Sequence, residues 1–128
     1  METTDYVSYP IALALKKAGF DWPCISFYRN LDKELWEGGE MNWNNGVDCS
    51  APTLAVAQKW LREKDIAVSV QAREIQGELW YSADIITTKG INELVDGGFD
   101  YMGYEAALSA GIASALELII TPSPDLRH

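Results

Sequence analysis

Histidine and cysteine are scarce in this sequence, and their scarcity excludes several kinds of chemistry. The one histidine is His128, and the two cysteines are Cys24 and Cys49. A catalytic dyad or triad with histidine as its base needs a ring held firmly beside the nucleophile, which a residue at the chain end does not supply. Two cysteines and one histidine also fall short of a four-ligand structural zinc site. We therefore expect no histidine catalysis, no metal centre and no cofactor.

Basic residues are also few. Lysine and arginine total 10 against 19 aspartates and glutamates, which gives a net charge of −9. An acidic surface repels phosphate backbones, so direct binding to nucleic acid or to an anionic membrane is disfavoured. The same charge suits solubility, a basic protein partner or imitation of a nucleic acid.

Long apolar runs are absent as well, and we expect no signal peptide. No stretch approaches the roughly 20 apolar residues that span a bilayer. The start Met1–Asp5 is acidic and polar rather than basic and apolar. We expect a cytoplasmic protein whose thiols stay reduced.

What is present indicates one α+β domain. With 128 residues, 48% of them hydrophobic, the chain is large enough to bury a core without disulfides or metal. We place the domain at residues 1–120 and expect residues 121–128, which include Pro122 and Pro124, to form a flexible tail.

The stretch Ser50–Thr87 organises the chain. A Ser-x-Pro start followed by apolar residues at helical spacing predicts a helix, with Trp60 in the apolar arc and therefore in the core. From Ile66 onward apolar and polar residues alternate, and Gly77 marks a turn before the alternation resumes. This pattern predicts a β-hairpin.

The same signals predict the other elements. They are a helix after Ser8, a strand over Cys24–Arg29, a return strand over Glu34–Glu37 and a last helix over Tyr104–Ile120. The order is α-β-β-α-β-β-α. The simplest architecture is a two-layer α+β sandwich, with a mostly antiparallel four-stranded sheet and helices on one face.

Small residues line one side of the last predicted helix. Ala107, Gly111 and Ala115 fall along one line. Because glycine costs a helix about 1 kcal/mol relative to alanine, close packing is the expected reason for Gly111. This line, or an uncovered sheet face, would provide a surface for a homodimer.

Residues 38–49 have no periodicity and are predicted to form a loop that is long for a compact domain. Four residues in or just before this loop are candidate binding residues: Trp36, Met41, Trp43 and Asn44. Flat apolar faces beside amides suit a base, a nucleotide-like ligand or a protein hot spot. The alternative is structural, with Trp36 plugging the edge of the core and the other tryptophan lying over it.

A second candidate surface lies on the predicted hairpin. Arg73, Trp80 and Asp84 fall on the face away from the helices, where cross-strand pairing brings them near one another. Together they would form a ligand platform. The alternative is a plain surface ion pair between Arg73 and Asp84.

Three blocks stand out in order along the chain: Val7-Ser8 with Leu15–Asp21 and Pro23-Cys24, then Ser50–Leu54 with Gln58–Arg62, then Tyr104–Leu108. They resemble a family of small proteins encoded by phages and prophages of gut anaerobes. The resemblance implies a phage accessory protein that acts inside an infected bacterium, against host defence. It assigns no catalytic or binding residue.

Three functions follow as hypotheses. The first is a non-enzymatic binding protein that captures a host protein or a small nucleotide-like signal through Trp36–Trp43 and the Trp80 face. The second is a metal-assisted hydrolase that uses the carboxylates between Asp32 and Asp48. The third is an acidic mimic of nucleic acid. The sequence favours binding over enzymatic activity.

Overall fold

The computed structural model describes residues 5–95 and 98–120, so the predicted tail at 121–128 lies outside the described residues. The helices are α1 (Tyr9–Ala18), α2 (Leu54–Glu63) and α3 (Tyr104–Ile120). The strands are β1 (Cys24–Tyr28), β2 (Leu35–Met41), β3 (Cys49–Ser50), β4 (Ile66–Ile75), β5 (Glu78–Thr87) and β6 (Asn92–Leu94). A short 3₁₀ turn, η2 (Trp43–Asn45), lies between β2 and β3.

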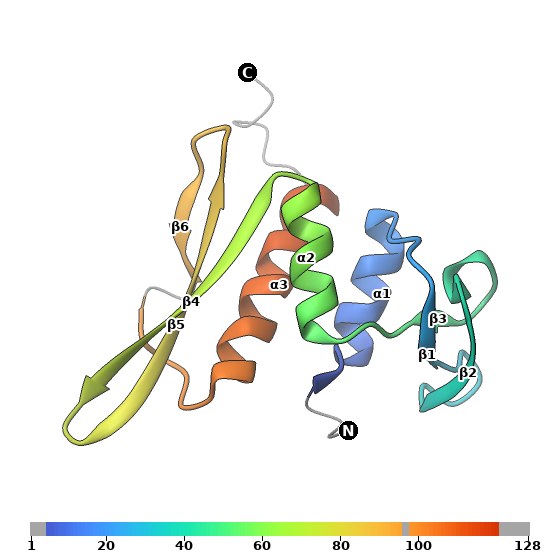
Figure 1. Cartoon of the computed structure of the whole chain (residues 1–128), viewed down its shortest axis with the longest axis horizontal. Helices are drawn as coiled ribbons and strands as arrows, with labels where there is room; N and C mark the ends of the chain where they lie inside the picture. The colour runs from blue at the N-terminus through green and yellow to red at the C-terminus, as the bar shows by residue number, and fades with distance from the viewer. Residues whose placement is uncertain (1–4, 96–97, 121–128) are drawn as a thin grey trace.

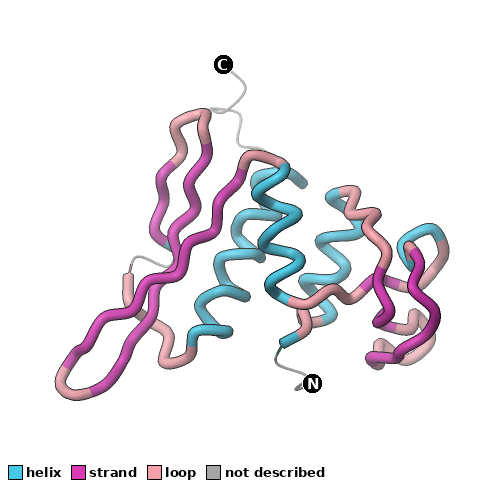
Figure 2. The backbone as a smooth tube through the Cα atoms, viewed as in Figure 1, coloured by secondary structure: helices cyan, strands magenta, loops and turns pink. Residues whose placement is uncertain are grey.

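The α+β class is confirmed, but the predicted four-stranded sheet is wrong. The strands form two separate antiparallel sheets in the orders β2-β1-β3 and β4-β5-β6. Figures 1 and 2 show the helices between them, with the β4-β5-β6 sheet at one end and the small sheet at the other. Each hairpin has its own third strand, and the two sheets pack on different helices: β4 and β5 on α3, and β3 on α1.

The predicted loop at residues 38–49 is also more regular than expected. β2 continues to Met41, η2 follows, and Cys49 and Ser50 form a strand on the other edge of β1. Two hydrogen bonds explain why this segment is regular. Asn42 Oδ1 caps η2 by accepting from Asn44 N at 3.0 Å, and Asn44 Oδ1 accepts from Ser50 N at 2.8 Å.

The helices supply most of the core. Trp60 is 2% exposed, as the helical spacing predicted, and its ring packs edge-on against Phe20 with centroids 5.5 Å apart. The other large buried side chains come from all three helices and from the hairpin, and include Leu15, Leu61, Ile85, Ile112 and Leu116.

The small-residue line of α3 packs inside the molecule. A Cβ added at Gly111 would lie 2.5 Å from Val68 Cγ1 and 3.0 Å from the Ala83 Cβ, so the backbone of α3 runs directly against the hairpin. Ala107 and Ala115 are fully buried. This line therefore holds α3 to the sheet of its own chain and is not an exposed surface for a second copy.

The β4-β5 hairpin extends well past the helices. Its strands pair from Ile66↔Thr87 to Ile75↔Glu78, and the two turn residues Gln76 and Gly77 have φ values of +52° and +83°. Positive φ at both turn positions is the type I′ geometry that matches strand twist. Figure 1 shows the turn at the tip farthest from the helices, and the residues from Gln71 to Ile75 are exposed.

Candidate functional site

The outer face of the hairpin carries the three residues that the strand alternation placed there. Arg73 pairs directly with Trp80 across the two strands, and Ser69 pairs with Asp84. Residues directly opposite in an antiparallel pair share a face. The structure therefore brings Arg73, Trp80 and Asp84 onto one surface, opposite the face that packs on α3.

Arg73 and Asp84 have other partners instead of forming an ion pair. Gln71 Nε2 donates to Asp84 Oδ2 at 2.7 Å. The Arg73 guanidinium carbon lies 5.3 Å from the centre of the Phe99 ring, which is the geometry of a cation–π contact. The expected surface ion pair is therefore replaced by an amide–carboxylate bond and an arginine–aromatic contact.

Phe99 belongs to a segment that runs beside β5 and that the sequence pattern did not identify. Tyr101 N donates to Tyr81 O at 3.2 Å, and Tyr81 N donates to Tyr101 O at 2.7 Å, so a bridge ties the segment to the strand edge. The Tyr81 ring also packs edge-on against Tyr104 at the start of α3. The available signal was two aromatic residues, Phe99 and Tyr101, inside a glycine-rich stretch.

An open hollow of about 520 Å³, which we name the hairpin hollow, lies between the segment and the hairpin tip. Its lining residues are Ile75, Gln76, Glu78, Trp80, Phe99 and Asp100. The rings and the carboxylates give it two kinds of contact, flat apolar faces and negative charge. A ligand that enters it can therefore stack on the rings and can also donate hydrogen bonds, or present a positive charge, to the carboxylates.

The small sheet uses two of the predicted binding residues for its own structure. The Trp43 ring stacks on Phe27 with centroids 3.9 Å apart, and Trp43 Nε1 donates to Cys24 O at 2.8 Å. Asn44 Nδ2 donates to Phe20 O at 2.9 Å, while its Oδ1 accepts from Ser50 N. Trp43 and Asn44 therefore hold the small sheet together.

Trp36 and Met41 are exposed, at 45% and 47%. The structural alternative from the sequence had the tryptophans the wrong way round, because Trp36 lies on the edge strand β2 whereas Trp43 covers Phe27. The Arg29 guanidinium lies 4.3 Å from the centre of the Trp36 ring and also pairs with Asp32. This exposed pair of β2 residues and the hairpin hollow belong to different sheets, and Figure 1 shows the two sheets on opposite sides of the helices, so they do not form one site.

The two thiols are poorly placed for chemistry. Burial, with a smaller contribution from Glu40, raises the pKa of Cys24 to about 11, and burial also raises the pKa of Cys49. Cys49 pairs with Tyr28, four residues along β1 from Cys24. At about 3.3 Å per residue that spacing exceeds the roughly 7 Å limit between disulfide-bonded Cα atoms. The thiols are therefore neither ready nucleophiles nor partners in a disulfide.

The acidic residues between Asp32 and Asp48 do not gather into a site. The guanidinium of Arg29 lowers the pKa of the Asp32 carboxyl, and Asp48 Oδ1 accepts from Asn30 N at 2.9 Å. Across residues 5–95 and 98–120, no group of three or more His, Cys, Asp or Glu side chains is positioned to hold a metal ion. The metal-assisted hydrolase stays a prediction.

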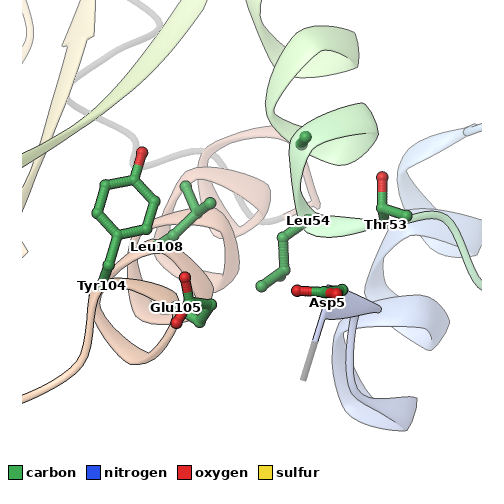
Figure 3. A pocket seen from close by; sticks show the side chains of 7 residues that line it. Asp5, Thr53, Leu54, Tyr104, Glu105 and Leu108 are labelled. Atoms are coloured by element: carbon green, nitrogen blue, oxygen red, sulfur yellow. The ribbon is translucent and has the colours of Figure 1, made fainter. Parts of the chain in front are cut away.

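A second pocket, of about 300 Å³, lies where α2 and α3 begin. Figure 3 shows Leu54 and Leu108 in it, with the carboxylates of Asp5 and Glu105 at its side. Acidic groups beside helix N-termini are the ordinary complement to the partial positive charge there. Glu105, in the first turn of α3, has this role, so its carboxylate alone does not indicate a ligand site.

Comparisons with known proteins add no further constraint. No family model, no curated protein and no solved structure matches this chain. Within the described residues, no helix is long and apolar enough to cross a membrane.

Proposed function

We propose that this chain is a non-enzymatic binding protein that captures its ligand on the outer face of the β4-β5 hairpin. One observation carries the proposal: the hairpin hollow joins Trp80 and Phe99 to charged groups in a space of about 520 Å³. Binding sites of this size combine aromatic walls with a few polar groups that orient the ligand.

The mounting of the hairpin supports this proposal. At its base α3 packs directly against it where Gly111 approaches Val68, and Figure 2 shows its tip extending away from the helices. Packing that fixes the base limits the entropy lost when a partner docks on the tip. The hollow is thus presented to a partner with little rearrangement of the chain.

The remaining candidates contribute less to the proposal. Trp43 and Asn44 are engaged within the small sheet, so only Trp36 and Met41 are available there, and they stay a prediction as a second contact surface. A protein side chain and a nucleotide-like molecule can each provide an aromatic or planar group that stacks on Trp80.

The biological setting is part of the same proposal. The resemblance to phage and prophage proteins favours an accessory factor that acts in the cytoplasm of an infected bacterium and interferes with host defence. In that setting a binding protein acts by sequestration, so its effect depends on how tightly it binds its partner.

Trp80→Ala tests the proposal. Tagged wild-type protein and the variant would be used to capture partners from a bacterial lysate, with mass spectrometry of bound proteins and of released small molecules. Because stacked aromatic residues dominate binding energy, we expect at least a tenfold loss of the specific partner in the variant. Leu31→Ala is the control, since it removes an apolar side chain that is 83% exposed in the turn between β1 and β2 and that belongs to neither candidate surface. Equal capture by wild type and Trp80→Ala would contradict the proposal.

A further inference from the structure

The chemistry of the hairpin hollow indicates which kind of group it takes. Two aromatic rings, Trp80 and Phe99, stand beside two carboxylates, Glu78 and Asp100, and no basic residue is among its lining residues. Aromatic faces attract cations, and carboxylates form paired hydrogen bonds with guanidinium groups. We infer that the hollow accepts the guanidinium of an arginine side chain from a basic partner protein, an inference that rests on the proposed function.

The chain already places one guanidinium against this site. Arg73 lies over the Phe99 ring at 5.3 Å, within the roughly 6 Å range of a cation–π contact. The ring face therefore accepts a planar cation in this setting. Arg73 approaches from β4 and is not a lining residue of the hollow, which leaves Trp80 and both carboxylates to the partner.

A phosphate-bearing ligand fits the same surface less well. Glu78 and Asp100 would repel a phosphate, as would the net charge of −9. A lysine is also a poorer fit than an arginine, because its compact ammonium neither stacks on a ring nor bonds a carboxylate through two parallel donors. The partner chemistry that remains is an arginine in a basic protein segment.

Arg73 is the residue that best distinguishes an arginine ligand from a phosphate ligand, because it affects their binding in opposite directions. For an arginine ligand, Arg73 competes for the Phe99 face and repels the incoming charge. For a phosphate ligand, Arg73 is a favourable charge beside the Phe99 ring that lines the hollow. Removing Arg73 therefore strengthens binding of a cation and weakens binding of a phosphate.

The experiment is isothermal titration of the full chain with three probes: a hexa-arginine peptide, a hexalysine peptide and adenosine monophosphate. We expect hexa-arginine to bind more tightly than hexalysine. Glu78→Gln with Asp100→Asn should weaken hexa-arginine binding about tenfold, since two charge-assisted contacts are lost. Glu34→Gln with Glu37→Gln changes the net charge by the same amount, but at the small sheet, and should leave the affinity for hexa-arginine within about twofold of the wild-type value. Arg73→Ala should raise the affinity for hexa-arginine about threefold.

Two results would overturn the inference. One is an equal loss of hexa-arginine affinity in both double variants, which would mean attraction to overall charge alone. The other is adenosine monophosphate binding that Trp80→Ala and Arg73→Ala both weaken while hexa-arginine does not bind. That second result would contradict the arginine inference but not the proposed function. Equal capture of partners by wild type and Trp80→Ala in the lysate experiment would contradict the proposed function itself. Circular dichroism melting of each variant establishes that it is folded.

Discussion

At the scale of single residues, Gly38 shows how the small sheet depends on the absence of a side chain. A Cβ at this position would lie 2.7 Å from Trp43 Cζ2 and 3.4 Å from the Phe27 ring. We predict that Gly38→Ala lowers the free energy of unfolding by about 1–3 kcal/mol, because it overpacks the Phe27–Trp43 stack. Urea denaturation measures the change.

The neighbouring glycine provides the control for that prediction. A Cβ at Gly39 would meet nothing within 4 Å, so Gly39→Ala should change stability by less than about 0.5 kcal/mol. Similar losses in both variants would show that strand conformation, and not the tryptophan contact, requires glycine at these positions.

Cys24 gives a prediction that depends on pH. Burial, followed by Glu40, raises its pKa from 9.0 to about 11, so the folded protein favours the protonated thiol. The resulting stabilisation is complete below pH 9 and is lost as the pH rises through about 11. We predict that the unfolding free energy of wild type falls more steeply over this range than that of Cys24→Ser. Other groups, such as Tyr28, titrate in both proteins, so parallel curves would contradict the prediction.

At the scale of elements, the contact between α3 and the hairpin fixes the position of the proposed binding surface. We predict that Gly111→Ala destabilises the protein by about 1–3 kcal/mol, even though alanine favours a helix by about 1 kcal/mol over glycine. The reason is the 2.5 Å approach to Val68 Cγ1. Thermal or urea unfolding measures the effect.

A double variant tests the cause of that effect. Val68→Ala removes the atom that the new Cβ would strike, so the cost of Gly111→Ala should be smaller in the Val68→Ala background, with a coupling of about 1 kcal/mol. If the losses in unfolding free energy were strictly additive, residues 68 and 111 would not be in steric conflict in the Gly111→Ala variant.

At the scale of the whole molecule, one core connects the two sheets. Buried residues that touch one another run from Cys24 and Cys49 at the small sheet, through Leu15 and Leu61 in the helices, to Ile85 on the hairpin. We predict a single cooperative unfolding transition, with coincident midpoints by tryptophan fluorescence and by far-ultraviolet circular dichroism. Gly38→Ala should shift both midpoints equally. Two separated transitions would show that the sheets unfold independently.

The local sequence determined most of the individual elements. Helical spacing placed Trp60 in the core, and the period of two assigned the hairpin and put Arg73, Trp80 and Asp84 on one face. These features depend on short-range rules, namely backbone periodicity and cross-strand pairing, which act between residues close in sequence.

The tertiary structure alone decided how those elements are combined. The strands form two sheets that pack on different helices, an arrangement that depends on contacts between elements far apart in sequence. Trp43 is covered, and Trp36 is not, because the Phe27 ring and the backbone at Gly38 provide a surface on which the Trp43 ring packs. Phe99 joined the candidate site only through the bridge between Tyr81 and Tyr101. Such contacts link residues far apart in sequence, and their energies depend on shape complementarity that a periodic pattern does not encode.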